Sequence, residues 1–470
     1  MGASFYPVSM LPIILLNCVG LTPRLLAQAP RLAQLAAQGW SLPMREVTPA
    51  VTCSAQATIL TGEPVNIHGV VANGWLFRDT NEVRFWQQSN RLIQAEPLYL
   101  TAKKRAIERG IPFTSAKLFW WFNQGDAVDY SITPKPWYGI DGDKIFGIAG
   151  TPKRLAESLE ADLGPFPFPS FWGPMAGLPC TQWIARAAAR LIQDQQPTLS
   201  LVYLPHLDYD PQRFGPSGTD MAKCVKELDD AVAPILDTAK HIGAQVWVLS
   251  EYGHCDVTRP IFPNRLLRTA GLLEVRTGPL GEQLDLYGSR AFAVVDHQLA
   301  HIYVRDAEDI PRVCDLLAPL PGVRRVLVGQ ERAELQLDHP RSGEIVLLAE
   351  PDAWFAYPFW LNDDVAPDYA RCVAIHHKPG YDPCELFFDP RYRFPKLHAA
   401  RRLIQKKLGF RTKFDVVPLE ASLVRGSHGL PAGDPQDGAI LIGQGPKPSE
   451  KTVPMTAVKS LILAALGLTQ

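Results

Sequence analysis

The chain has 470 residues, enough for one large domain with insertions or for two to three units. Hydrophobic residues make up 46% of it and charged residues 20%, which excludes a disordered chain. Lysine and arginine (47) balance aspartate and glutamate (48), so the overall charge does not favour nucleic-acid binding, and local groups must hold any anionic substrate.

Cysteine usage and the N-terminal residues favour a cytoplasmic protein. Eight cysteines are spread along the chain without a CxxC pair, which is typical of a reduced compartment. The apolar run at residues 10–19 is too short to span a bilayer. It has no basic segment before it and no small-residue cleavage site after it, so we expect neither a signal peptide nor a membrane span.

The predicted elements alternate between strands and helices, which indicates an α/β fold. Residues 13–19, after Pro12, form a short unalternating apolar run that is typical of a central parallel strand. A helix is expected over residues 25–38, kinked or split at Pro30. The alternation returns with strands at residues 199–204, 244–250 and 438–443 and a helix at 221–240.

Two segments are predicted to be insertions into this fold. Residues 100–185 are rich in Trp, Phe, Pro and Gly, which fits a cap or lid better than core sheet. Its aromatic cluster at 119–122 is favoured as packing inside the lid, with stacking on a flat substrate group as the alternative. Residues 290–350 contain strand-like runs around a helical stretch at 310–317, which indicates a small α+β insertion.

The first motif with chemical significance lies where a loop enters a helix at Thr52. Helix N-termini present free N–H groups and a partial positive charge, so a hydroxyl at this position lies near a potential phosphate site. Taken alone, such a threonine is more often a helix cap than a nucleophile. The residues around it change that balance.

This stretch resembles the nucleophile segment of nucleotide pyrophosphatase/phosphodiesterases of the alkaline phosphatase superfamily. In that family the nucleophilic Thr sits nine residues before the Thr of a Thr-Gly pair, with a Pro three residues before it; here these are Thr52, residues 61–62 and Pro49. A family continuation, His-Gly-Ile-Val-x-Asn, is matched by residues 68–73. The resemblance implies that Thr52 is the nucleophile and that Asn73 helps to hold the phosphate.

The chain departs from the family directly after the nucleophile. The family has Phe-Pro-Asn-His there, and this chain has Cys-Ser-Ala-Gln at residues 53–56. Gln56 is a predicted substrate-binding residue of this segment.

A second motif follows the strand at 199–204, where carboxylates and histidines suit a divalent metal. The family has an Asp there, then a His four residues later, then Gly-Pro. Aligning the chain on the Gly-Pro at 215–216 makes Asp208 the predicted metal ligand and puts Gln212 in the place of the His. The alternative is a structural loop with a capped helix.

A different alignment of the same motif remains open. Anchoring on Pro205 would pair His206 with Asp210, but the Gly-Pro register is the better landmark. We therefore expect His206 and Gln212 to be substrate-binding residues rather than metal ligands.

The third motif follows the strand at 244–250, where the superfamily usually has metal-binding Asp and His residues before a Gly. Here Glu251 and Tyr252 stand in their places, followed by Gly253. Glu251 can bind a metal through oxygen and is a predicted ligand, unless it is a buried carboxylate paired with an arginine. A tyrosine is a poor substitute for an imidazole, although His254 is close by.

Two further metal ligands are implied by the resemblance. His428 belongs to a His-Gly pair before the strand at 438–443, and the family His at this point binds metal. At the end of the first strand the family has a metal-binding Asp, whose place Val19 takes here. Asn17, two residues earlier on the same strand face, is a predicted ligand through its carbonyl oxygen. A buried Asn that bonds to a neighbouring loop is the alternative.

The resemblance implies a three-layer, alkaline-phosphatase-like α/β fold over residues 1–470, with a central, mostly parallel sheet, a lid and a small α+β insertion. It also implies metal-dependent hydrolysis of a phosphodiester or pyrophosphate bond in a nucleotide-like or other small phosphorylated metabolite, through a phosphothreonine. With more oxygen ligands than usual, zinc selectivity weakens, and one or two ions of zinc, manganese or magnesium are expected. No nucleic-acid partner is expected.

Two other functional interpretations remain open. One is hydrolysis of a phosphonate, phosphomonoester or sulfate ester, since the segment near residue 310 is similar to an insertion of phosphonoacetate hydrolases. The other is a degenerate site that only binds a phosphorylated ligand. Beyond these motifs, a histidine in the stretch Asp296-His297 to His301 is favoured as a core residue over a substrate group.

Overall fold

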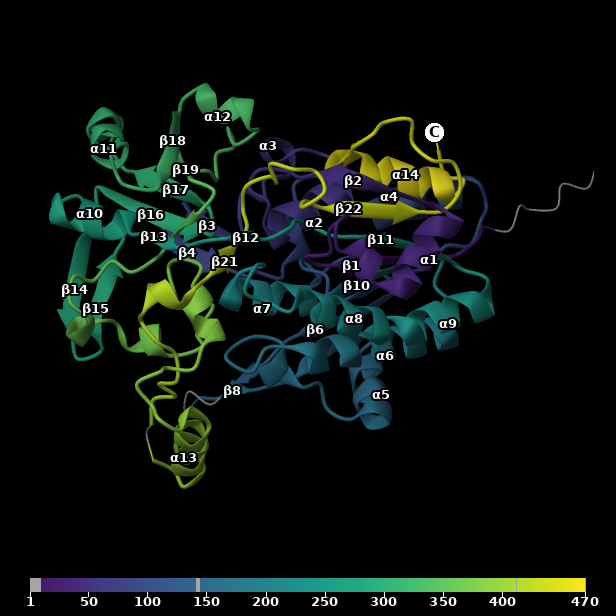
Figure 1. The fold of residues 1–470 in the computed structure, drawn as a ribbon, viewed down its shortest axis with the longest axis horizontal. Coiled ribbons are helices and arrows are strands. Elements are labelled where there is room, and N and C mark those ends of the chain that lie inside the picture. The colour runs from purple at the N-terminus through teal and green to yellow at the C-terminus, as the bar shows by residue number, and fades with distance from the viewer. Residues whose placement is uncertain (1–9, 141–143, 411, 470) are drawn as a thin grey trace, which may run out of the picture.

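A nine-stranded sheet forms the centre of the molecule (Figure 1). The structure is a computed structural model that describes residues 10–140, 144–410 and 412–469. The order of the strands is β23 (Val453–Pro454), β2 (Trp40–Arg45), β22 (Ile440–Gly443), β11 (Gln245–Leu249), β1 (Ile13–Cys18), β10 (Leu199–Leu204), β5 (Ser115–Leu118), β6 (Tyr130–Pro134) and β9 (Ile148–Thr151). The five strands from β11 to β6 run parallel, whereas β22 and β9 are antiparallel to their inner neighbours. The expected central, mostly parallel sheet is confirmed.

Helices cover both faces of this sheet, because its central strands are apolar on both sides. In β1, Ile13 and Leu15 face one core while Ile14 and Leu16 face the other, and all are buried. The first core lies under α2 (Thr52–Thr61), α4 (Leu98–Glu108) and α14 (Val458–Ala465). The second lies under α1 (Pro30–Gln38), α5 (Arg154–Leu163), α6 (Leu178–Gln195), α8 (Met221–Ala231) and α9 (Ala233–Ile242). The result is three layers, with α6, α8 and α9 below the sheet in Figure 1.

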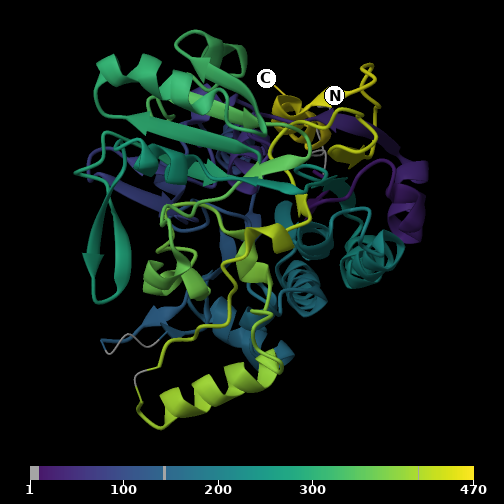
Figure 2. The same cartoon turned by 60° about the vertical axis from the view of Figure 1, so that its left-hand side comes forward.

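A smaller α+β unit lies beside the central sheet, on the left in Figure 1 and nearer the viewer in Figure 2. Its antiparallel sheet has the order β16 (Ala291–Asp296), β17 (Leu299–Val304), β19 (Ile345–Ala349) and β18 (Val323–Val328). Its helices and hairpin are α10 (Pro263–Thr269), α11 (Ile310–Leu317), α12 (Glu331–Glu334), β14 (Glu274–Gly278) and β15 (Gly281–Asp285). The four strands fall within residues 290–350, where the sequence predicts an α+β insertion, and they share a hydrophobic core of their own.

Short two-stranded pairings connect the remaining loops. These are β3 (Gly74–Phe77) with β4 (Glu82–Phe85), β7 (Trp137–Tyr138) with β8 (Lys144–Ile145), β12 (Cys255–Asp256) with β21 (Gly426–Ser427), and β13 (Arg259–Ile261) with β20 (Ala353–Phe355). Two short helices, α3 (Val65–His68) and α7 (His206–Phe214), lie near the carboxyl edge of the sheet. Helix α13 (Pro395–Lys407) projects from the body and buries none of its residues (Figures 1 and 2).

The segment 100–185 does not stand apart from the sheet, contrary to the expectation of a cap. It contributes β5, β6 and β9 to the central sheet, and α6 packs on one face. Its aromatic cluster 119–122 is buried. The ring of Phe119 contacts Phe166, with ring centroids 4.7 Å apart. An aromatic composition is shared by lids and by cores, so composition alone misassigned this segment.

Prolines divide two of the predicted helices: the division at Pro30 was expected from the sequence, and the one near Pro234 was not. The helix expected over 25–38 is a short 3-10 turn, Leu26–Gln28, followed by α1, which begins at Pro30. The helix expected over 221–240 is divided into α8 and α9, and Pro234 lies in the first turn of α9. Proline lacks an N–H group and is best tolerated in the first turn of a helix, where that group would have no partner within the helix.

Asp229 of α8 holds the beginning of α1 in place. No residue of α1 caps its own N-terminus. The buried Asp229 carboxylate accepts hydrogen bonds from the backbone N–H groups of Arg31 and Leu32, at 3.0 Å each. Because the first N–H groups of a helix lack partners within the helix, this contact joins α1 to α8 on the lower face of the sheet.

Replacement of Asp229 by alanine is expected to lower the free energy of unfolding by about 2 kcal/mol, because two backbone donors, one of them buried, lose a charged acceptor. Urea unfolding of the variant measures this loss. The matched control is Asp230→Ala: Asp230 contacts Arg31 at 2.6 Å but is half exposed, so its loss is expected to cost less than about 1 kcal/mol. Equal effects of the two substitutions would contradict the capping role.

Candidate active site

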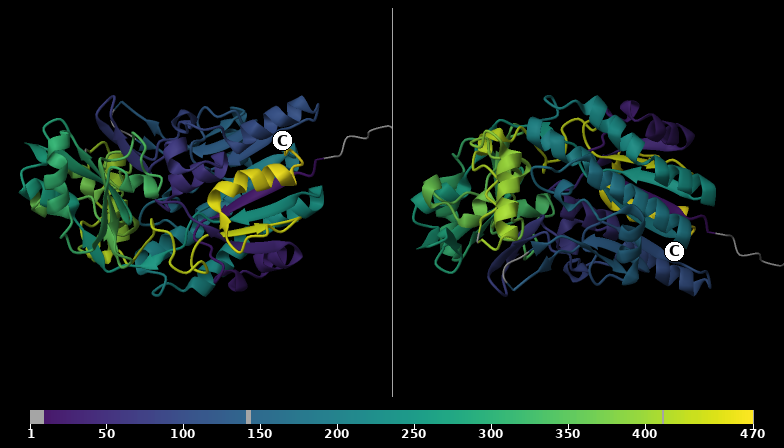
Figure 3. Two further views of the ribbon diagram at one scale, coloured as in Figure 1. Left: turned by 90° about the horizontal axis from the view of Figure 1, so that it is seen from above. Right: turned by 90° about the horizontal axis from the view of Figure 1, so that it is seen from below.

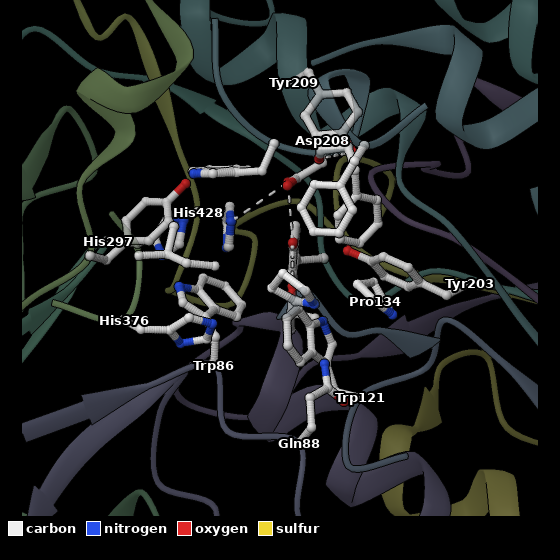
Figure 4. Close-up of a pocket in the computed structure, with 18 residues that line it drawn as sticks. Trp86, Gln88, Trp121, Pro134, Tyr203, Asp208, Tyr209, His297, His376 and His428 are labelled. Carbon is white, nitrogen blue, oxygen red and sulfur yellow. Dashed lines mark hydrogen bonds and ion pairs between the residues drawn. The ribbon is translucent and has the colours of Figure 1, made fainter. Parts of the chain in front are cut away.

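The carboxyl ends of β1, β10 and β11 meet at one edge of the sheet, because these three strands are parallel neighbours. Ligands of open α/β sheets bind beyond this edge. The loop after β10 leads into α7, which carries Asp208, and the loop after β11 carries Tyr252 and His254. His428, which follows β21, lies beside Asp208 (Figure 4), and Thr52 of α2 reaches the same place through its contact with Tyr252. Residues far apart in the sequence therefore form one cluster.

Thr52 is the first residue of α2. Its side chain is buried, and its hydroxyl lies 3.0 Å from the phenol oxygen of Tyr252. The backbone N–H of the next residue, Cys53, is held by the side-chain oxygen of Asn73 at 2.9 Å. The Thr52 hydroxyl thus lies at a helix N-terminus, where the partial positive charge favours an anionic group.

Asp208, His254 and His428 form a group that is able to hold a metal ion, since one ligand atom of each lies within 4.8 Å of the others. Nε2 of His254 is 3.1 Å from Oδ1 of Asp208, and Nε2 of His428 is 3.8 Å from the same oxygen. The Nδ1 atom of His428 donates a hydrogen bond to the carbonyl of Ala50 at 2.8 Å. Because Nδ1 carries the proton, Nε2 presents its lone pair to the group, as in a histidine that binds a metal.

A two-stranded pairing brings the two histidines together. In β12 and β21, Cys255 pairs with Ser427, so His254 and His428 flank the same short antiparallel ladder. Their rings lie 5.3 Å apart. One carboxylate and two imidazoles fit zinc or manganese. The sequence predicted Asp208 and His428 as ligands, but for His254 it offered only nearness to Tyr252.

The protonation states of this group also suit a cation. Burial by itself raises the pKa of Asp208, but the hydrogen bond from His254 and the nearby rings of His428 and His297 lower it below its ordinary value. Burial, together with His297, lowers the pKa of His428 well below its ordinary value. At neutral pH Asp208 is therefore ionised and His428 is neutral, which are the forms that bind metals.

Asn17 and Glu251, the other two predicted ligands, contact each other beside this group. Oε1 of Glu251 accepts hydrogen bonds from Nδ2 of Asn17 at 2.5 Å and from Nε2 of Gln56 at 2.7 Å. Burial raises the pKa of Glu251 to about 8, although these bonds and the Thr52 hydroxyl act in the opposite direction. The partners of Glu251 are amides, not the arginine considered as an alternative.

Two oxygen atoms in this second cluster lack a hydrogen-bond partner. They are Oε2 of Glu251 and Oδ1 of Asn17, both buried. Buried acceptors are normally satisfied by a donor or a cation. Oxygen ligands alone favour a hard ion such as magnesium over zinc. The role of both residues as ligands of a second ion stays a prediction.

Tyr252 occupies the space between Thr52 and Asp208. Its phenol donates a hydrogen bond to Oδ1 of Asp208 at 3.2 Å, and its oxygen lies 3.0 Å from the Thr52 hydroxyl. Its ring stacks on His428, with centroids 3.6 Å apart. Sequence reasoning treated this tyrosine only as a poor metal ligand and missed that it bridges Thr52 and Asp208.

The predicted substrate-binding residues are held by protein groups. Gln56 bridges two groups. Its Nε2 donates to Glu251, and its Oε1 accepts a hydrogen bond from the backbone N–H of Trp121 at 2.8 Å. Gln212, one turn after Asp208 on α7, accepts a hydrogen bond from the phenol of Tyr381 at 2.5 Å. Its Nε2 is buried without a partner. Their direct contact with a substrate stays a prediction.

His206 lies at the start of α7 in a different cluster. Its Nε2 is 3.1 Å from Oε2 of Glu227, and Cys224 completes a second group of potential metal ligands. Both partners come from α8. His206 is not among the described residues that line the cavity beside Thr52. A substrate contact of His206 therefore has no support from its position.

Asn73, Asp296 and His297 form a chain of hydrogen bonds behind Thr52. Asp296 accepts from the backbone N–H and the side chain of Asn73, at 2.6 and 3.1 Å, and contacts Nδ1 of His297 at 2.8 Å. The His297 ring lies between His428 and Tyr381, at 3.7 and 3.8 Å. Its Nε2 has no partner. His297 therefore belongs to the cavity wall and not to the satisfied core.

His301 behaves as the sequence interpretation expected of a core histidine. Its Nε2 contacts the carbonyl of Val71 at 3.2 Å, and its Nδ1 accepts from the backbone N–H of Gly343 at 3.2 Å. Both ring nitrogens are occupied. The two histidines differ because His297 lies in the turn between β16 and β17, whereas His301 lies within β17. No sequence pattern revealed this difference.

A cavity of about 100 Å³ opens beside Thr52 and Asp208 (Figure 4). Its walls are mostly aromatic, and Trp86 and Trp121 contact each other with ring centroids 5.0 Å apart. Among the described residues that line it, none is a lysine or an arginine. The N-terminus of α2 is thus its main source of positive potential, and a cation bound by Asp208, His254 and His428 would add to it.

A second cavity of about 630 Å³ reaches His254 and His428 from another side. It contains Arg24 and Arg324. Arg24 pairs with Asp434 at 2.9 Å and with Asp437 at 2.5 Å, so its charge is largely compensated. The metal-binding group therefore borders two cavities.

Asp296 is expected to make the stability of the protein depend on pH. Burial raises its pKa to about 7 from an ordinary 3.8, despite the bonds from Asn73. Between these values the folded state binds a proton that the unfolded state does not, so stability is lost as the pH rises. Relative to Asp296→Asn, the wild type should lose at most about 4 kcal/mol of unfolding free energy across this window.

Urea unfolding of both proteins from pH 5 to 7.5 measures this loss. The diagnostic quantity is the change with pH in the difference between the two unfolding free energies, because the substitution itself also adds a pH-independent amount to that difference. A difference that does not change with pH would show that Asp296 is ionised throughout.

Comparison with known proteins agrees with this geometry. A model of the family described as type I phosphodiesterase / nucleotide pyrophosphatase matches residues 13–382. Within the described ranges, no helix is both long and apolar enough to cross a membrane.

Solved structures share the fold at low sequence identity. Murine ectonucleotide pyrophosphatase/phosphodiesterase 5 is 14% identical, with a TM-score of 0.58 over 97% of this chain and 95% of that chain. Its inactive variant in complex with AMP is 15% identical, with a TM-score of 0.57 over 98% and 96%. Phosphonoacetate hydrolase from Sinorhizobium meliloti 1021, in complex with phosphonoacetate, is 16% identical, with a TM-score of 0.61 over 98% and 97%. The predicted alkaline-phosphatase-like fold is confirmed.

Proposed function

Because the chain belongs to the type I phosphodiesterase/nucleotide pyrophosphatase family, a family of metal-dependent hydrolases, we propose that Thr52 is its nucleophile. The substrate would be a phosphodiester or pyrophosphate bond in a small phosphorylated metabolite. One observation carries the proposal: the Thr52 hydroxyl lies at the N-terminus of α2, 3.0 Å from Tyr252, which donates to Asp208 of the metal-binding group.

The residues around Thr52 orient its hydroxyl. The phenol of Tyr252 donates to Asp208, so the Thr52 hydroxyl donates its own hydrogen bond to the phenol oxygen, which directs a lone pair of Thr52 toward the phosphorus. Asn73 fixes the first turn of α2 through the N–H of Cys53. A divalent cation held by Asp208, His254 and His428 would supply Lewis acidity for the phosphoryl oxygens.

Hydrolysis of the phosphothreonine requires water in the second step. His297 is the candidate to orient it, since its Nε2 has no protein partner and its ring contacts His428. Burial lowers the pKa of His297 to about 3, so the ring is neutral at physiological pH and its Nε2 can accept a hydrogen bond from that water. Asp296 holds the other nitrogen of the ring.

The proposal includes a second ion at Asn17 and Glu251 and a cytoplasmic location. The unpartnered oxygens of these two residues support the ion. All eight cysteines are free thiols, which agrees with a reducing compartment.

Replacement of Thr52 by alanine is expected to lower kcat by at least about a thousandfold, because the covalent route is lost. Hydrolysis of bis-p-nitrophenyl phosphate under Mg²⁺, Mn²⁺ and Zn²⁺ measures this, and Thr52→Ser should retain part of the activity. The matched control is Ser54→Ala, which removes a neighbouring hydroxyl of α2 that donates only to the carbonyl of Val70. Wild-type turnover by Thr52→Ala would sink the nucleophile assignment.

Replacement of His428 by alanine is expected to weaken metal binding by at least about a hundredfold, because one of three ligands is lost. Metal content after dialysis measures this effect. His241→Ala is the control, since His241 is exposed on α9. Loss of only one of two ions in Glu251→Gln would identify the second ion site, at Asn17 and Glu251. An unchanged metal content in His428→Ala would refute the first ion site, at Asp208, His254 and His428.

A further inference from the structure

Residues 390–414 form the most basic segment of the chain. They contain nine lysines and arginines and no aspartate or glutamate, although the whole chain has a net charge of −1. The segment includes α13, which projects from the body at the lower edge of Figure 1 and lies across the face turned to the viewer in the right panel of Figure 3. Positive charge is thus concentrated on one projecting element.

Contacts on one side of α13 hold it against the chain segments that flank it. Nε2 of His398 and Nε of Arg402 contact Oδ1 of Asp415, at 3.1 and 2.8 Å. The His398 ring stacks on Tyr392, with centroids 3.7 Å apart. These contacts fix the inner side of the helix and leave its outer side to solvent.

The outer side of α13 carries an apolar stripe. Leu397, Ile404 and Leu408 are 69%, 60% and 69% exposed. At 100° per residue these three lie within about 40° of one another on the helix. The exposed cations Arg401 and Lys407 border the stripe on its two sides. Phe394 and Phe410, just beyond the ends of the helix, are exposed as well.

A second exposed apolar group lies on the same side of the molecule. The β7–β8 hairpin lies below the sheet, toward α13 in Figure 1. At and beside it, Trp137, Ile140, Ile145 and Phe146 are all at least half exposed. Two separate elements therefore present large apolar side chains toward one side.

We propose that α13 docks this protein on the surface of an anionic lipid membrane. The cationic borders complement acidic headgroups, while the apolar stripe enters the boundary between headgroups and acyl chains. Long basic side chains can lie beside such a stripe with their charges in the headgroup region. A nucleic acid would use the cations but would leave the leucines and phenylalanines in water, so the combination favours lipid.

The β7–β8 hairpin directly continues one wall of the cavity beside Thr52. Pro134 and Pro136 of the cavity wall lead directly into Trp137, and Ile375 and His376 of the opposite wall precede α13 in the chain. The inference does not rest on the proposed hydrolysis, since the stripe and its charges lie outside the cavity.

Cosedimentation with phosphatidylcholine vesicles, with and without 30% phosphatidylserine (about the anionic fraction that binds basic helices), tests the proposal. The wild type should bind the anionic vesicles at least about tenfold more tightly than the neutral ones. The variant Leu397→Ser/Ile404→Ser/Leu408→Ser keeps every charge and should lose at least about tenfold in binding. The variant Lys396→Gln/Arg401→Gln/Lys407→Gln should lose about a hundredfold, from about fivefold per cation.

Matched controls keep the effect specific to α13. Leu280→Ser/Tyr287→Ser removes exposed apolar groups of the smaller α+β unit, and Lys240→Gln/Lys447→Gln/Lys451→Gln removes three exposed cations elsewhere. Both controls should bind vesicles like the wild type. Hydrolysis of soluble bis-p-nitrophenyl phosphate should be the same in all variants if the wild type is active, and circular dichroism verifies their folding.

Three outcomes would overturn the proposal. The first is no binding of the wild type to anionic vesicles. The second is unchanged vesicle binding by the triple-serine variant. If that variant also binds duplex DNA as tightly as it binds the anionic vesicles, the partner is a polyanion. The third is a concentration-dependent dimer in sedimentation velocity that the triple-serine variant loses, without vesicle binding, which would indicate a second copy of this chain.

Discussion

The parallel pairing of β1 with β10 and β11 is the constraint on which the site depends. Cys18 lies beside Leu204, and Asn17 lies beside Leu249, so the loops after all three strands leave the sheet at the same edge. The strands are held there by apolar side chains on both faces, which leaves no alternative position for β1 in the sheet. Asp208 and His254 meet only because of this register.

A second, much smaller strand pairing completes the candidate metal-binding group of Asp208, His254 and His428. The two-residue ladder between β12 and β21 carries His428 to His254, and the bridge from Ala50 to Gly429 carries it to the entrance of α2. The Ala50 carbonyl then selects the proton position on His428. A few backbone hydrogen bonds therefore set both the location and the tautomer of the His428 imidazole.

Substitutions relative to the family pattern are compensated by neighbours rather than left open. Tyr252 fills the position of an imidazole and hydrogen-bonds to both Thr52 and Asp208. Glu251 is anchored by two amides, and Gln212 by the phenol of Tyr381. Each of these side chains is thus positioned by at least one hydrogen bond, while Oε2 of Glu251 and Nε2 of Gln212 have no partner among the described residues.

Sequence patterns alone were enough to predict the strand and helix alternation, and to single out the candidate nucleophile Thr52 together with Asp208 and His428, which the structure places close together. These depend on local patterns: apolar periodicity, helix starts and short motifs. It did not reveal that the 100–185 segment joins the central sheet, because buried and lid aromatics have the same composition. It also left His254, His297 and the bridging role of Tyr252 unassigned, since their roles arise from contacts between strands that are distant in the chain. Such contacts follow from the folded structure alone, because strand register and side-chain packing set the positions of the atoms. A sequence motif identifies residues without positioning them.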